Sequence, residues 1–181
     1  MSVTQFNLPA KQRAERKLLI TVAAWNESAG GTASTEVREI LGTRTEDSSI
    51  EYNPDIQQST DIRGINYTDV NKTQPQQDFD PYLILGGSKL GAKLDDIRRR
   101  NALTELGNFK IYIITAYKGS SGAYEAEVHD NCTILYTALG GDANVNMPIS
   151  VYLSNDYMGK GKPGTGTVNK LSDDFEFTLD I

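Results

Sequence analysis

The stretch TEDSSIEYNPDIQQSTDIRG, residues 45–64, decides the fold class of this 181-residue chain. Its odd-numbered positions are polar on both sides of Pro54, whereas Ile50, Ile56 and Ile62 fall on even-numbered positions. Side chains two residues apart share one face of a β-strand, so the pattern predicts long strands with a hydrophilic face and a sparse apolar face. Gly64, which is free to adopt a positive φ, predicts a hairpin turn at Arg63-Gly64.

The rest of the chain adds further strand signals and one helix signal. Leu90, Leu94 and Ile97 recur at helical spacing after Ser88, which can cap the helix, and a run of arginines ends it at Arg100. Short aliphatic and aromatic runs predict strands at 17–25, 109–118, 124–128, 133–139, 149–153 and 175–181. We therefore predict eight or nine strands and one flanking helix in a single mainly β domain, sandwich-like or barrel-like, over residues 17–181. Residues 1–16 are predicted to form an extended N-terminal arm.

Composition excludes several classes of protein. With 38% hydrophobic and 23% charged residues, the chain belongs with soluble globular proteins. Its net charge of −6 argues against a protein whose function is to hold nucleic acid, but it does not exclude one beside which nucleic acid must pass without sticking. Cys132 is the only cysteine, so no disulfide can form within the chain. The apolar run within residues 11–25 is interpreted as a strand and not a signal peptide, and no run is long enough to predict a membrane span.

No catalytic pattern stands out. His129 is the only histidine, and Cys132 follows it three residues later in what is predicted to be extended chain. The two side chains are therefore predicted to lie on opposite faces of the strand, which argues against a Cys–His dyad. Residues 159–167 have the glycines of a phosphate-binding loop but lack its Lys-Ser/Thr pair and a following helix, which favours a hairpin tip. The run Arg98-Arg99-Arg100 is interpreted as a solvated helix end or a subunit contact. We predict no enzyme activity, cofactor or metal.

Several runs of residues link the chain to a known family. They are Ile40-Leu41-Gly42, residues 45–55, Thr60-Asp61-Ile62, residues 67–75 and residues 99–106, with weaker runs at 122–126 and 147–149 and in the C-terminal strand. Through these runs the chain resembles the major tail tube proteins of long-tailed, siphovirus-type bacteriophages. The resemblance covers most of the chain after residue 36.

The resemblance implies a β-sandwich flanked by one helix, which assembles as hexameric rings. Strands of the six subunits join into a continuous inner barrel, and rings stack through extended arms and a long loop into a conduit for the genome. The implied partners are further copies of the chain and the tape measure, tail tip and terminator proteins, while DNA passes the lumen without specific binding and no membrane is involved. The implied location is the virion tail, and the host cytoplasm during assembly. A tube from a contractile tail, a phage-derived bacteriocin or a secretion machine is a closely related alternative.

Charge divides the chain into an acidic and a basic part. Residues 46–80 hold eight acids and two bases, whereas residues 1–17 hold four bases and one acid. An acidic lumen would repel DNA over about 8–10 Å in physiological salt. We therefore predict lumen-lining residues in the acidic part: Asp47, Ser49, Glu51, Asp55, Gln57 and Asp61. We predict subunit contacts by the arm, which would dock on an acidic neighbour, and by the helix end: Phe6, Leu8, Lys11, Arg13, Arg98 and Arg99.

A monomeric β-sandwich binding module, for example for carbohydrate, is the alternative. It would share the strand content, and it should gather exposed aromatic side chains on one face. Tyr117, Tyr124 and Tyr152 are the residues that could form such a cluster.

Overall fold

A computed structural model describes residues 8, 10–28, 34–42, 45, 47–120, 123–154, 164–171 and 177–180. The described part of the protein is mainly β with a single α-helix, as predicted. Eleven strands occur in these residues, more than the eight or nine predicted: β1 (Leu19–Ser28), β2 (Ser34–Ile40), β3 (Ile50–Glu51), β4 (Asp55–Thr60), β5 (Asn66–Lys72), β6 (Gln76–Phe79), β7 (Phe109–Ser120), β8 (Ala123–Tyr136), β9 (Ile149–Tyr152), β10 (Gly164–Leu171) and β11 (Phe177–Asp180). The helix α1 spans Lys89–Arg100, and short 3-10 turns cover Arg16–Leu18 and Leu103–Gly107.

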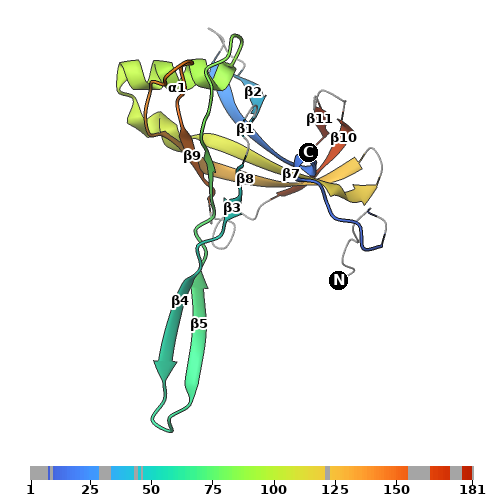
Figure 1. Ribbon diagram of the computed structural model, residues 1–181, viewed down its shortest axis with the longest axis vertical. Coiled ribbons are helices and arrows are strands. Elements are labelled where there is room, and N and C mark those ends of the chain that lie inside the picture. Colours follow the sequence, from blue (N-terminus) through green and yellow to red (C-terminus); the bar gives the residue numbers. More distant parts are fainter. Residues whose placement is uncertain are drawn as a thin grey trace.

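Nine strands form one antiparallel sheet, and β4 and β5 form a separate pair. The main path of the sheet is β2-β1-β7-β8-β9-β6-β3, and β10 and β11 extend it from β8. The 14-residue strand β8 connects its two parts, because Ala123–Val128 pair with β7 and β10 whereas Thr133–Tyr136 pair with β9. Figure 1 shows the body formed by this sheet with α1 across one end, while β4 and β5 project from the other.

The helix follows its predicted pattern closely. The Ser88 hydroxyl accepts a hydrogen bond from the Gly91 N–H (3.0 Å), and the helix ends at Asn101, which has a left-handed φ of 53°. Leu90, Leu94 and Ile97 are fully buried against the sheet. Burial of each such side chain contributes about 1.5–3 kcal/mol, which holds α1 on the body.

Both faces of the β1–β7–β8 part of the sheet are buried. One face packs towards α1 through residues that include Ala23, Ile111 and Ile113. The other face has its own cluster: Ile20, Val22, Ala24, Tyr112, Ile114, Ala126 and Val128. This explains why β1 is a continuous apolar run in the sequence and does not alternate. The run within residues 11–25 is thus a core strand, as interpreted.

Candidate assembly surfaces

The strands β4 and β5 form a free-standing hairpin, residues 55–72. They pair antiparallel from Asp55↔Lys72 to Thr60↔Asn66, with a register shift between Asp55 and Ile56. The seven residues of β5 give the ribbon a length of about 23 Å at 3.3 Å per residue. Figure 1 shows it extending along the longest axis of the molecule, at the end opposite α1.

The turn of the hairpin is organised by Asp61. Its Oδ1 accepts hydrogen bonds from the N–H groups of Arg63 (2.8 Å) and Ile65 (2.9 Å). Gly64 takes a φ of 76°, and its N–H donates to the Asp61 carbonyl (2.9 Å), so the predicted turn at Arg63-Gly64 is confirmed. The Ile65 N–H and then the Tyr67 hydroxyl hold the pKa of Asp61 below its usual value. Asp61 is therefore a structural residue of the turn.

The hairpin presents apolar side chains to solvent on both faces. Residues directly opposed in an antiparallel pair lie on the same face, and faces alternate along each strand. One face, here called the aliphatic face, contains the pair Ile56 and Val70, which are 52% and 61% exposed, beside Gln58, Thr68, Thr60 and Asn66. The opposite face, here called the tyrosine face, contains Gln57, Asp69, Ser59 and Tyr67, and continues to Asp61 and Ile65. Ile65 is 48% exposed, and Ile62 at the tip is fully exposed.

The root of the hairpin departs from the sequence prediction. Residues 45–63 do not form continuous strands, because Asn53 adopts a φ of 38° and Pro54 follows it, so the chain leaves the body there. β3 on the body side has only two residues, Ile50 and Glu51, paired with β6. The Gln74 N–H donates to the Tyr52 carbonyl (2.9 Å) and closes the root. The sparse apolar face, expected to pack on an outer layer, is half-exposed at Ile56.

The six predicted lumen-lining residues consequently fall into two groups. Asp47, Ser49 and Glu51 lie on the body, where with Ser48, Gln76 and Asp78 they line a shallow hollow of about 190 Å³. Asp55, Gln57 and Asp61 belong to the hairpin. The structure therefore does not bring the six together on one strand.

A buried hydrogen-bond chain fixes the segment that leads into β3. Thr21 of β1 donates to the Gln77 side chain (2.8 Å), whose amide donates to the Ser48 hydroxyl (3.0 Å). That hydroxyl donates to the Asp78 carbonyl (2.7 Å), and Arg16 donates to the Ser48 carbonyl through Nε (3.1 Å) and Nη2 (2.6 Å). Arg16, where the arm joins the body, thus binds the segment at Ser48 that buried residues of the body also bind. None of these contacts was predicted from the sequence, since each joins distant residues.

The predicted arm contacts are only partly described. Phe6 lies outside the described residues, Leu8 is half-buried, and Lys11 and Arg13 are exposed. The arginines at the helix end are paired within the subunit: Arg98 and Arg99 with Asp95 (both 2.7 Å). Arg100 pairs with Asp96 (2.7 Å) and Glu105 (2.8 Å). These pairs compensate the positive charge locally, which weakens the case for a nucleic-acid patch.

A groove lies beside α1, at the far end of the molecule from the hairpin tip. Its volume is about 880 Å³, and its lining combines apolar groups of Trp25, Val37 and Phe109 with charged side chains of the helix, Lys89, Lys93 and Asp96. The Trp25 and Phe109 rings meet edge to face with centroids 6.1 Å apart. The groove mixes apolar and charged surface, as protein-binding surfaces do.

His129 and Cys132 lie on the same face of β8, which corrects the prediction that they lie on opposite faces. Asn131 has a φ of 56°, and the register shifts so that Phe109 opposes Cys132 while Ile111 opposes His129. Burial raises the pKa of the Cys132 thiol to about 11, and the thiol donates to the His129 carbonyl (3.2 Å). A thiol with this pKa is protonated at neutral pH and is a poor nucleophile.

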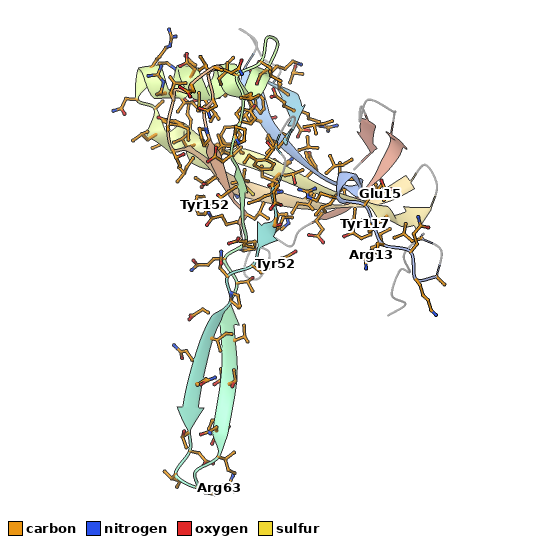
Figure 2. The ribbon with its side chains drawn as sticks, in the orientation of Figure 1. Arg13, Glu15, Tyr52, Arg63, Tyr117 and Tyr152 are labelled. Carbon is orange, nitrogen blue, oxygen red and sulfur yellow. The ribbon has the colours of Figure 1, made fainter. Side chains whose placement is uncertain are left out.

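The remaining candidate sites are only partly described. Tyr117 and Tyr152 lie on β7 and β9, with β8 between them, and Figure 2 shows them on separate parts of the body. The side chain of Tyr124 lies outside the described part, as do residues 159–163 of the glycine-rich stretch, whereas residues 164–167 begin β10. Among the described residues, no group of three or more His, Cys, Asp or Glu is placed to hold a metal ion. No helix in the described part of the chain has the length and apolarity to cross a bilayer.

Comparison with known proteins gives no family assignment: no family model matches the chain, and no curated protein matches it in sequence.

Proposed function

We propose that this protein is the structural subunit of a phage tail tube, which assembles as stacked hexameric rings around a conduit for DNA. The observation that supports the proposal most is the exposed hairpin of residues 55–72. A two-stranded ribbon is marginally stable alone in water, and this one places Ile56, Val70 and Ile65 in solvent. Apolar side chains gathered on a projecting element mark a protein contact. The resemblance described above supplies the type of assembly, in which a long loop joins successive rings.

The two ends of the molecule differ, which supports stacking of one copy on the next. The hairpin projects at one end of the longest axis, and α1 lies at the other (Figure 1). The groove is lined in part by side chains of α1. An element at one end that contacts a different surface at the other end of the next copy makes a head-to-tail interface. Such interfaces are repeated along an axis instead of closing on themselves, so they generate open stacks.

The electrostatics are compatible with a conduit for DNA. Among the described residues that line it, the hollow beside β3 has three carboxylates, those of Asp47, Glu51 and Asp78, and no basic side chain. DNA carries about one negative charge per 1.7 Å of axis, so a lumen lined by such carboxylates would repel it and discourage adhesion. In the proposed ring, Asp47, Ser49 and Glu51 face the lumen, whereas Asp55, Gln57 and Asp61 belong to the element that joins rings.

Electron microscopy of the purified full-length chain over a concentration series, with size-exclusion chromatography, tests this proposal. Six-fold rings or hollow tubes are the expected result, either from the chain alone or after addition of a tail-tip initiator complex. A chain that stays monomeric in both conditions would contradict the proposal. Binding to a glycan array by that monomer would favour the alternative, a monomeric carbohydrate-binding module.

A further inference from the structure

We infer that the hairpin inserts between two neighbouring copies of the chain, one against each face, and does not lie on the surface of one copy. The inference rests on the proposed function and deepens it by naming what each face of the hairpin contacts. Its basis is the distribution of apolar side chains over two opposite faces.

Each face has its own apolar contact group at its own height along the ribbon. On the aliphatic face, Ile56 and Val70 are directly opposed near the root and stay more than half exposed. On the tyrosine face, Tyr67 and Ile65 lie near the turn and are 44% and 48% exposed. A ribbon laid flat on one copy would bury one of these groups and leave the other in water. A ribbon in a cleft would bury both.

The size of the hairpin also favours a two-sided contact. A ribbon about 23 Å long and about 10 Å wide offers roughly 230 Å² on each face, against the roughly 800 Å² that each partner buries in a standard interface. One face therefore supplies under a third of that area, whereas two faces supply more than half before any other contact is added. The polar residues between the apolar groups, such as Gln57 and Gln58, provide hydrogen-bonding groups on both faces.

A second copy of the chain is the occupant that symmetry favours. A closed ring of identical subunits has one cleft between neighbours for each subunit, and each subunit has one such hairpin. The numbers of hairpins and clefts in successive rings then match, and every hairpin can be covered on both faces. A different protein could cover every hairpin on both faces only if it were present in equal number.

Photo-crosslinking in mixed tubes tests the inference. Gln57 and Gln58 are adjacent, exposed and chemically identical, but they lie on opposite faces, so they form a matched pair. Tagged chains with a benzophenone amino acid at position 57, at position 58, or at both would be diluted into an excess of unlabelled chain, assembled and irradiated. Either single label should give tagged two-chain products, and the double label should add a three-chain product.

The outcomes separate the inference from the proposed function. Suppose that tubes form and that both single labels react, but that the double label gives only two-chain products. The two faces of the hairpin then contact the same copy, and the inference is wrong. If only one position reacts, the hairpin is covered on one face and the inference is wrong as well. In both cases the proposed function as a tube subunit would be unaffected. If the unlabelled chain forms no rings or tubes, the proposed function fails and the inference fails with it.

A second measurement uses side-chain substitutions that keep β-branching. The pair Ile56→Thr with Val70→Thr weakens the aliphatic face, and Ile65→Thr weakens the tyrosine face. Each change is expected to raise the critical concentration for assembly at least tenfold, whereas Asp142→Ser, an exposed change in the loop after β8, should leave it within about twofold. An effect confined to one face would contradict a two-sided contact.

Discussion

Removing the hairpin should separate assembly from folding. In the proposed variant, a four-residue Gly/Ser/Asn loop replaces residues 55–72 and joins Pro54 to Thr73. Every side chain described between positions 55 and 70 is exposed except the half-buried Asp61, and none of these described side chains belongs to either hydrophobic cluster. The root contact from the Gln74 N–H to the Tyr52 carbonyl is retained.

The expected change in stability is small and follows from loop length. Shortening an 18-residue connection to four residues lowers the entropy cost of closing it by about 1.3 kcal/mol, an upper bound because the ribbon is not a random coil. For a chain of this size that corresponds to a rise in Tm of at most about 3–5 °C. Loss of the exposed contacts themselves should change the free energy of unfolding by no more than about 0.5 kcal/mol.

Calorimetry and pelleting of assembled tubes would be measured on the same preparation. We expect a Tm equal to that of the intact chain or slightly higher, together with at least a hundredfold rise in the critical concentration. Asp142→Ser, an exposed change in the loop after β8, serves as the control and should alter neither quantity. A fall in Tm of more than about 5 °C would show that the hairpin stabilises the body. Unchanged assembly would show that it is not the inter-ring contact.

Three further predictions concern the body. Gln77→Leu deprives two hydroxyl groups of their buried amide partner and should lower the free energy of unfolding by about 2–3 kcal/mol in urea titrations. Hydrogen bonds from Arg100 and then Lys93 lower the pKa of Glu105 to about 2. The stabilising contribution of Glu105 is therefore present above about pH 4.5 and is lost as the pH falls towards 2, and Glu105→Gln should make the Tm depend less on pH over that range. Burial raises the pKa of Cys132 to about 11, so at pH 8 a disulfide reagent should react with the native protein about a hundredfold more slowly than with the unfolded chain.

Local signals in the sequence predicted the elements that depend on local physics. The spacing of Leu90, Leu94 and Ile97 with Ser88 before them identified α1, because the helix needs only a cap and one apolar stripe. The turn at Gly64 was predictable for the same reason, since the chain there requires a positive φ. Both predictions are confirmed.

The path of residues 45–63 was not predictable from alternation alone. A strand with one face on the core and a strand that projects into solvent have the same period of two, and Ile56 fits either arrangement. What distinguishes them is whether another part of the chain covers that face, which is not a local property. The only local sign of the break was Asn53-Pro54, where the chain turns away from the body.

The prediction that His129 and Cys132 lie on opposite faces was wrong because of a single residue. Alternation predicts opposite faces for residues three apart, but a bulge inserts one extra residue and restores the same face. Asn131 takes the left-handed conformation that such an irregularity needs, and asparagine adopts it more readily than most residues. The sequence Asp130-Asn131 was the available signal, and it identifies a bulge only once the register with β7 is known.

The composition of the hairpin follows from two opposing requirements on an exposed assembly element. A ribbon with more apolar side chains would be a template for unspecific strand pairing before assembly, and this one alternates its few apolar residues with Gln, Ser, Thr and Asn. Weak individual contacts suffice if they act together, as the hairpins of one proposed hexameric ring would. A loss of only about 0.5 kcal/mol per hairpin sums over six of them to about 3 kcal/mol, or roughly a hundredfold in the stability of the stack. Assembly should therefore respond steeply to changes on the hairpin that leave the isolated subunit almost unchanged.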